Sequence, residues 1–153
     1  MGTTETDRIE KSVQLRAPQS RVWRAITNAE EFGAWFGAKF EDRFVEGAMA
    51  RGKITIPGYE HMRLELHVDR IEPERHFSYR WHPFAIDPAV DYSAEPMTLV
   101  EFRLEGADGG TQLSIVESGF DQIPLERRAE AYRMNDGGWE AQARSIEEYV
   151  SQS

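Results

Sequence analysis

The chain has 153 residues, a formal net charge of −9 and no cysteine. Its length suits one domain with its own hydrophobic core, and the lack of thiols excludes disulfides, cysteine nucleophiles and cysteine-ligated metal sites. An acidic chain is repelled by phosphates, which argues against nucleic acids and anionic membranes as partners. No apolar run approaches the roughly 20 residues of a membrane span or the core of a secretory signal, so we expect a cytoplasmic protein with no membrane span.

The N-terminal third predicts a disordered leader at residues 1–8 and a single domain over residues 9–152. Apolar and polar residues alternate after the leader, which is the pattern of a half-buried strand. The apolar positions of this strand are Ile9, Val13 and Leu15. Two short helices are expected next, one starting after Pro18 and one ending near Gly37.

Alternation then predicts about six more antiparallel strands. The first is expected over residues 40–44 and the second over residues 49–56, before the turn signal Pro57-Gly58. The inward positions of the later strands are Met62, Leu64, Leu66, Val68, Phe77, Tyr79, Trp81, Val100, Phe102, Leu104, Leu113 and Ile115. Asp108-Gly109-Gly110 lies between the last two strands and predicts a tight hairpin.

The last third changes to helical spacing. Its apolar stripe is formed by Leu125, Ala129 and Tyr132, and then by Trp139, Ala143, Ile146 and Val150. Glycine costs about 1 kcal/mol inside a helix, so Gly137-Gly138 predicts a break or kink. Asn135 or Asp136 would then cap the second part of the helix.

Together these elements predict an α+β, helix-grip (START-like) fold. A curved antiparallel sheet of about six or seven strands would wrap around a long C-terminal helix, with two short helices after the first strand. Each strand has one polar face, so the other face of the sheet needs a cover, and only the last helix is long enough to provide it. Since a wide sheet cannot close fully on one helix, we expect a cavity between them.

The inward side chains of this fold are the candidate ligand-binding residues. They are Trp35, Phe36, Leu64, Leu66, Phe77, Tyr79, Trp81, Phe102, Glu117, Phe120, Tyr132 and Trp139. The aromatic residues suit a pocket for flat apolar ligands, and they suit ordinary core packing as well. Trp35, Phe36 and Phe120 are placed where the helix pair and the last loop should meet, as the mouth of a cavity or as simple packing.

Glu117 is the most informative single residue because it continues the inward parity of Leu113 and Ile115. A carboxylate in an apolar cavity has a raised pKa and could serve as an acid, a base or an anchor for a ligand. If the strand ends before it, Glu117 lies in water instead. Glu117 and Tyr79 are the only, weak, catalytic candidates.

Other site classes find little support. The chain has no nucleophile elbow, phosphate loop, dinucleotide fingerprint or His-Glu-x-x-His segment, and we expect no cofactor. His61 and His67 share a polar strand face but are about 20 Å apart at 3.3 Å per residue, so no metal site is expected. Residues 82–97 form a long loop that is either a lid or partner surface, or a plain insertion.

Residues 17–28, followed by Phe32 and Trp35, resemble the opening of the heat-shock protein 90 ATPase activator homologue-like family. This family belongs to the START/SRPBCC (birch-pollen-allergen-like) superfamily. Further matches are Gly47, residues 68–75, residues 109–113 and Gly138-Trp139, so that the resemblance covers roughly residues 9–150. It implies the helix-grip fold, but not one function, because members of the superfamily bind lipids, hormones and polyketides or act as cyclases.

Three functions therefore remain open. The first is a binding protein for an apolar or aromatic small molecule, which requires a cavity open to solvent. The second is a chaperone-associated interaction module, which a filled core and an exposed surface would favour. The third is a cyclase or lyase acting on an aromatic or polyketide-like substrate through Glu117 and Tyr79, which requires two polar groups converging on one pocket.

The resemblance also yields a negative prediction. Eukaryotic activators of the family carry an additional N-terminal domain that supplies most of the chaperone stimulation, and we expect no room for one here. The chain should therefore stimulate the ATPase of a cognate heat-shock protein 90 very little in a steady-state assay. Several-fold acceleration at equimolar protein would contradict this and favour the interaction module.

Overall fold

The structure is a computed structural model that describes residues 8–82, 95–107 and 109–151. Within these residues, seven strands form one antiparallel sheet in the order β1-β7-β6-β5-β4-β3-β2. The strands are β1 Arg8–Leu15, β2 Ala38–Phe40, β3 Met49–Ile54, β4 Arg63–Glu72, β5 His76–Trp81, β6 Thr98–Ala107 and β7 Gly110–Ser118. The helical segments are α1 Gln19–Thr27, α2 Ala29–Phe36, the short 3-10 helix η1 Phe120–Gln122 and α3 Leu125–Ser151.

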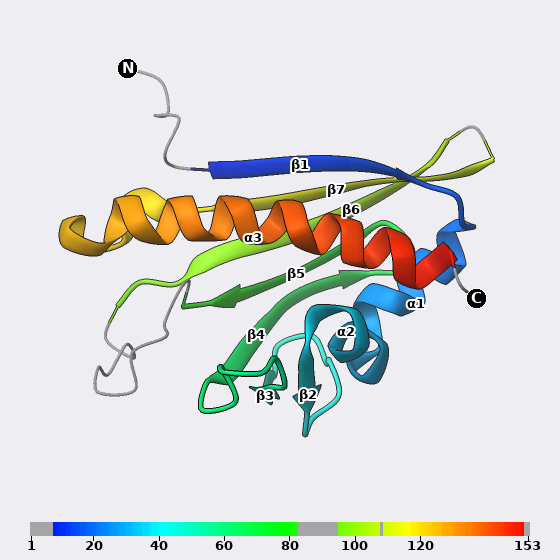
Figure 1. The fold of residues 1–153 in the computed structure, drawn as a ribbon. Coiled ribbons are helices and arrows are strands. Elements are labelled where there is room, and N and C mark those ends of the chain that lie inside the picture. The colour runs from blue at the N-terminus through cyan, green and yellow to red at the C-terminus, as the bar shows by residue number, and fades with distance from the viewer. Residues whose placement is uncertain (1–7, 83–94, 108, 152–153) are drawn as a thin grey trace, which may run out of the picture.

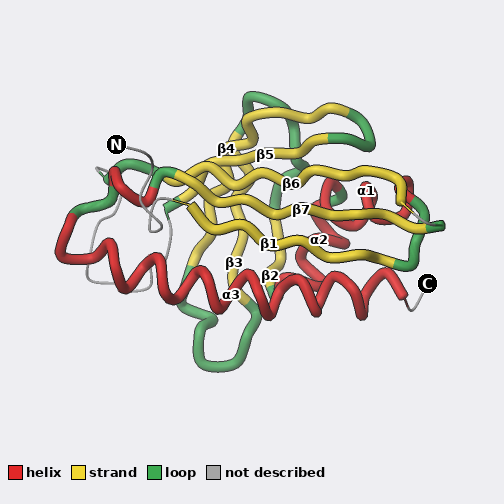
Figure 2. The backbone as a smooth tube through the Cα atoms, turned by 90° about the horizontal axis from the view of Figure 1, so that it is seen from above, coloured by secondary structure: helices red, strands yellow, loops and turns green. Residues whose placement is uncertain are grey.

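The connectivity explains how one helix comes to cover the sheet. Strands β2 to β7 are neighbours in chain order, and β1 pairs with β7 at the far edge. Helices α1 and α2 carry the chain from one edge of the sheet to the other, and α3 then lies along the same face (Figures 1 and 2). This arrangement confirms the predicted α+β helix-grip fold. None of the described helices has the length and apolar composition needed to cross a membrane.

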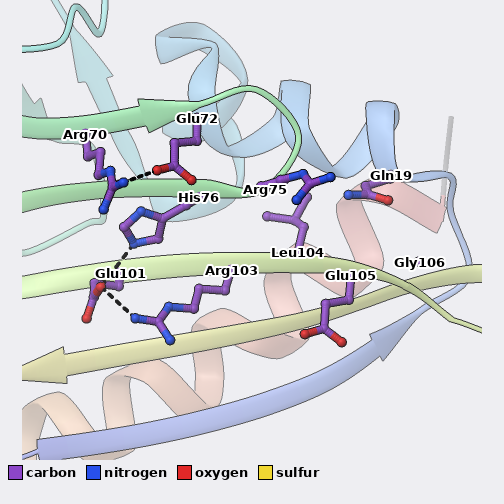
Figure 3. Close-up of a pocket in the computed structure, with 10 residues that line it drawn as sticks. All are labelled: Gln19, Arg70, Glu72, Arg75, His76, Glu101, Arg103, Leu104, Glu105 and Gly106. Carbon is purple, nitrogen blue, oxygen red and sulfur yellow. Dashed lines mark hydrogen bonds and ion pairs between the residues drawn. The ribbon is translucent and has the colours of Figure 1, made fainter.

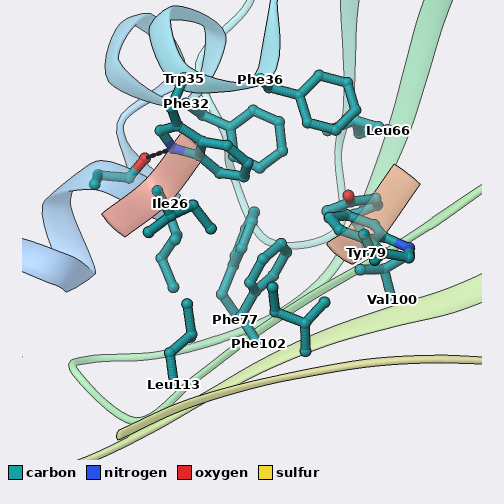
Figure 4. Packing of buried hydrophobic residues seen from close by; sticks show 14 of the residues in the cluster. Ile26, Phe32, Trp35, Phe36, Leu66, Phe77, Tyr79, Val100, Phe102 and Leu113 are labelled. Carbon is teal, nitrogen blue, oxygen red and sulfur yellow. Dashed lines mark hydrogen bonds between the residues drawn. The ribbon is translucent and has the colours of Figure 1, made fainter. Parts of the chain in front are cut away.

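The hydrophobic core is aromatic and centres on Phe32 of α2, which is fully buried. Its ring centroid lies 4.6 Å from that of Trp35 and 6.3 Å from that of Phe102 on β6. Phe77 and Tyr79 project from β5 into the same cluster, as the alternation predicts (Figure 4). Aromatic pairs at these distances add about 0.5–1.5 kcal/mol each beyond the area they bury.

The boundaries of α2 follow local chemistry. The side-chain oxygen of Asn28 accepts a hydrogen bond from the backbone N–H of Glu31 at 3.0 Å, which caps the first turn. Gly37 ends the helix with a φ of 92°, a left-handed conformation that glycine adopts without steric cost. The predicted end near Gly37 is therefore confirmed.

The predicted break in the C-terminal helix is wrong. Helix α3 runs without interruption through Gly137 and Gly138, and neither Asn135 nor Asp136 caps a second helix. Tertiary packing overrides the local cost of the glycines because the helix buries Trp139, Ile146 and Val150 against the rest of the core.

In the first turns of α3, the predicted apolar stripe is wrong for Leu125 and Ala129 but holds for Tyr132, which packs against the core. Leu125 is 75% exposed and Ala129 is also exposed. Ala131 is buried instead, and Tyr132 packs against Phe120 of η1 with ring centroids 5.3 Å apart. This part of the helix therefore contacts η1, and the Tyr132 hydroxyl also donates to the backbone carbonyl of Arg8 on β1.

Two strands are shorter than predicted. Strand β2 ends at Phe40, because Asp42 turns back to accept hydrogen bonds from the backbone N–H and the guanidinium of Arg51. Strand β3 ends at Ile54 rather than at residue 56. The predicted hairpin between β6 and β7 is confirmed, with Ala107 paired to Gly110. The leader up to residue 7 and most of the 82–97 loop lie outside the described residues.

Replacing Trp139 by alanine tests how α3 is held. Trp139 is 3% exposed and its ring lies 5.8 Å from those of both Trp81 and Phe102. Trp139→Ala should lower the free energy of unfolding by about 3–5 kcal/mol, as expected for emptying an aromatic core position. Urea denaturation measures this, with Glu140→Ala on the exposed side of the same turn expected to change it by less than about 0.5 kcal/mol. A loss below about 1 kcal/mol for Trp139→Ala would mean that this helix face is not packed as described.

Candidate functional site

An apolar cavity of about 390 Å³ opens between the middle of α3 and the end of the sheet formed by β3, β4 and β5. Its base includes the buried side chains of Phe36 and Ile54. The residues that line it are Phe36, Ile54, Ile56, Tyr59, Met62, Arg63, Leu64, Trp81, His82, Met134, Asn135, Gly138 and Gln142. They come from four separate stretches of the chain, so the cavity exists only in the folded protein.

The rim of this cavity is unusually apolar for a protein surface. Ile56, Tyr59 and Met134 are 42%, 50% and 47% exposed, and all three line the cavity. They are half of the large hydrophobic side chains that are exposed on the described surface. Single exposed apolar residues need no explanation, but a group of them around an opening marks an interaction site.

Gly138 lines the cavity from the middle of α3. A Cβ atom added there would meet no atom of the described structure within 4 Å, and the same holds for Gly137. A glycine inside a helix costs about 1 kcal/mol relative to alanine. The glycine at position 138 therefore leaves open space above the cavity in place of a side chain.

Glu117 lies directly behind the cavity wall, fully buried, at the end of β7. Its Oε1 atom accepts hydrogen bonds from Asn135 Nδ2 at 2.9 Å and from Trp139 Nε1 at 2.7 Å. Its Oε2 atom accepts from Trp81 Nε1 at 2.8 Å and from the hydroxyl of Thr98. The prediction from strand alternation that Glu117 points inward is confirmed. Its carboxyl group is not an unpaired anchor for a ligand, because both of its oxygens already accept hydrogen bonds from side chains of β5, β6 and α3.

Two buried groups near this network have altered acidity. Burial raises the pKa of Glu117 above its usual value, and the four donors offset part of that effect. Burial, and secondarily the charge of Glu117, raises the pKa of the Tyr79 phenol well above its usual range. The Tyr79 hydroxyl is the one buried side-chain polar atom that lacks a hydrogen-bond partner among the described residues. Such a group costs about 1–3 kcal/mol.

The structure sorts the predicted ligand-binding residues into three groups. Phe36, Leu64 and Trp81 line the cavity. Glu117 and Trp139 lie one layer behind the lining, and Glu117 accepts hydrogen bonds from the indole N–H groups of Trp81 and Trp139. The remainder lie away from the cavity, in the aromatic core or in the contact between η1 and α3: Trp35, Leu66, Phe77, Tyr79, Phe102, Phe120 and Tyr132.

Several lining residues escaped prediction from the sequence: Ile54, Ile56, Tyr59, Met62, Met134, Asn135, Gly138 and Gln142. One signal in the sequence that could have indicated the cavity was the glycine pair within the apolar stripe of the last helix. A glycine that breaks a helix and a glycine that leaves space beside a continuous helix look the same in a sequence. The other was the turn at Pro57-Gly58, which carries an apolar residue on either side instead of polar ones.

A second hollow of about 560 Å³ lies over the outer face of the sheet and has the opposite character (Figure 3). Glu101 accepts from His76 Nε2 at 3.0 Å and from Arg103 at 3.1 Å, and Arg70 pairs with Glu72. These charged groups neutralise one another. Among the described residues, no group of three or more histidine, aspartate or glutamate side chains is placed to hold a metal ion.

The fold and the cavity define a helix-grip protein with an apolar space between its sheet and its C-terminal helix. Residues 16–151 match the family described as activator of Hsp90 ATPase homolog 1-like protein, and the chain belongs to this family. No curated protein matches the chain.

Several solved structures share this fold. Protein MLL2253 of Mesorhizobium loti is 24% identical with a TM-score of 0.75, over 95% of this chain and 98% of that one. A protein of Arthrobacter aurescens is 18% identical with a TM-score of 0.78, over 100% and 91%. The Aha1 dimer of Colwellia psychrerythraea is 14% identical with a TM-score of 0.69, over 94% and 95%. At these identities the likeness establishes the fold alone.

The acidity of Glu117 gives a prediction for stability. Because the pKa of the folded state is raised, the folded chain keeps this proton at pH values where the unfolded chain has lost it. The resulting stabilisation is complete below the usual pKa of 4.5 and is lost as the pH rises through the folded pKa. Between pH 4.5 and neutrality, the free energy of unfolding of the wild type should therefore fall relative to that of Glu117→Gln, by at most about 1.4 kcal/mol per pH unit.

Urea denaturation of both proteins across this pH range measures the effect. Glu105→Gln, which changes an exposed carboxylate of β6, is the matched control and should follow the wild type. If the wild type instead gains stability relative to Glu117→Gln as the pH rises, the four donors outweigh burial and the pKa is lowered.

Proposed function

We propose that this protein binds an apolar or aromatic small molecule in the cavity beneath Gly138. The observation that carries the proposal is the combination of an apolar cavity with a solvent-exposed apolar rim. A volume of about 390 Å³ falls within the usual range for small-molecule sites, which are concave and mostly apolar with a few fixed polar groups. Here Asn135 and Gln142 are such groups, and each is held by a hydrogen bond to the protein.

A chaperone-associated module is the alternative that the family name and the Aha1 relative suggest. The exposed Ile56, Tyr59 and Met134 could serve a protein partner as well as a ligand. Their position argues for a ligand, because they surround an opening rather than forming a flat patch that a partner could cover.

Catalysis through Glu117 and Tyr79 has less support. Neither residue lines the cavity, and both oxygens of Glu117 already accept two hydrogen bonds each. A general acid or base must lie within hydrogen-bond reach of the substrate proton. The proposal is therefore binding rather than a cyclase or lyase reaction.

The two glycines of α3 provide a matched test. Gly138→Leu should fill the cavity, whereas Gly137→Leu places the same side chain on the same helix outside the lining. Both variants should gain about 0.5–1 kcal/mol in the free energy of unfolding, because leucine is a better helix former than glycine. Gly138→Leu should bind the fluorescent probe N-phenyl-1-naphthylamine at least roughly tenfold more weakly, a loss of about 1.4 kcal/mol, and Gly137→Leu should bind it like the wild type.

Fluorescence titration of the three proteins separates the possible outcomes. Equal probe binding by wild type and Gly138→Leu would contradict the proposed site. Equal weakening in both leucine variants would show that the probe follows helix stability rather than the cavity.

A further inference from the structure

The phenol of Tyr79 is a buried polar group that lies just behind the cavity lining. Tyr79 is fully buried on β5, and its hydroxyl lacks a hydrogen-bond partner among the described residues. Burial, and secondarily the charge of Glu117, raises the pKa of this phenol, so the hydroxyl keeps its proton and remains a donor. A buried hydroxyl without a partner is unusual in a folded protein, and an acceptor brought to it would remove its cost.

The cavity comes within one side chain of this hydroxyl. Tyr79 precedes Trp81 by two residues on β5, so both side chains lie on the same face of the sheet. Trp81 lines the cavity, and its ring centroid is 5.3 Å from that of Tyr79. Tyr79 is therefore the next residue inward along the strand from the cavity wall.

The side chain between the cavity and the Tyr79 hydroxyl is Phe36. It lines the cavity from the last residue of α2. Its ring lies 5.9 Å from Trp81 and 5.1 Å from Phe32, and both of these rings also neighbour Tyr79. The hydroxyl oxygen of Tyr79 points toward Phe36 and Leu66 (Figure 4). A different rotamer of Phe36 would open the hydroxyl to the cavity, and such side-chain changes are common on binding.

The amides of Asn135 and Gln142 are the other uncharged donors of the inner lining. One N–H of each bonds to the protein, and the second N–H can bond to a ligand. Both residues are partly exposed, so water reaches these groups when the cavity is empty. A ligand acceptor would replace water there with little net gain, whereas at Tyr79 it would satisfy a group that has no partner.

We propose that the Tyr79 hydroxyl donates a hydrogen bond to the ligand after the ring of Phe36 turns aside. The ligand class is then a flat apolar molecule whose leading end carries an uncharged acceptor, such as a carbonyl oxygen or a pyridine-type nitrogen. A charged end is disfavoured at this depth because it would lose its hydration. This inference rests on the proposed function and narrows its ligand class, with Tyr79 as a specificity-determining residue.

Isoquinoline and naphthalene test the role of Tyr79 because they share one shape and differ in a single ring nitrogen that accepts a hydrogen bond. Calorimetric titration slightly above neutral pH, where isoquinoline is uncharged, gives the ratio of the two affinities for each protein. Tyr79→Phe removes only the hydroxyl and should lower the isoquinoline-to-naphthalene ratio by about fivefold or more, with naphthalene binding unchanged. Phe36→Leu should raise the ratio, because a smaller side chain leaves the hydroxyl open to the cavity.

Tyr149→Phe is the matched control. The Tyr149 hydroxyl donates to Glu31 at 3.1 Å, and Tyr149 does not line the cavity. Tyr149→Phe should therefore lower the thermal midpoint of unfolding and leave the affinity ratio unchanged. Tyr79→Phe should not lower the midpoint, because the hydroxyl it removes has no partner in the ligand-free protein.

Each other outcome contradicts a definite part of the inference. A ratio unchanged by Tyr79→Phe would overturn it and leave the proposed function standing, as would a ratio that falls only in Gln142→Met. A lower unfolding midpoint for Tyr79→Phe would show that the hydroxyl has a partner already, which overturns the inference as well. A ratio that Phe36→Leu does not raise would overturn the role of Phe36. Failure of both compounds to bind the wild type would contradict the proposed function and this inference with it.

Discussion

The buried carboxyl group of Glu117 constrains everything around it. A carboxylate removed from water without partners costs several kcal/mol, so the fold is stable only if donors converge on this position. They come from β5, β6 and α3 through Trp81, Thr98, Asn135 and Trp139. The network therefore fixes how α3 is placed along the sheet. It also fixes the ring of Trp81 and the amide of Asn135, which form part of the cavity wall.

The position of the cavity follows from how unevenly the aromatic residues are distributed. Phe32 and its neighbours fill the space between α2 and the middle of the sheet, and the rings there lie within 4.6–6.3 Å of Phe32. Among the described residues, the rings that pair with Trp139 of α3 come from α2, β5 and β6, and none comes from β3 or β4. Gly138 faces the cavity with no side chain, and Ile56 and Tyr59 extend from the turn after β3 to its border. The cavity thus lies at one end of the contact between α3 and the sheet rather than at its centre.

The sequence predicted the fold and the inward direction of Glu117 and Trp139 because alternation along a strand and periodicity along a helix are local properties. The sequence did not separate residues that line the cavity from residues that fill the core. Alternation along a strand shows which face of the sheet a side chain lies on, but not whether it reaches the cavity. Tyr79 and Trp81 share one parity, yet only Trp81 reaches the cavity. Asn135 was interpreted as a helix cap because its partner, Glu117, is distant in the chain. The continuous helix through the glycines likewise depends on packing that no local pattern contains.

If a ligand enters the space bordered by Trp81, as we propose, its binding should disturb the hydrogen bonds that Glu117 accepts behind this ring. The four tryptophans offer a direct test, because the indole N–H of each gives its own NMR signal. During titration with N-phenyl-1-naphthylamine, the signal of Trp81 should move most and that of Trp139 should follow, since both donate to Glu117. Trp35, which donates to the carbonyl of Ala25, and Trp23 on α1 should stay in place. Saturable binding that moves Trp35 or Trp23 and leaves Trp81 unchanged would contradict the account.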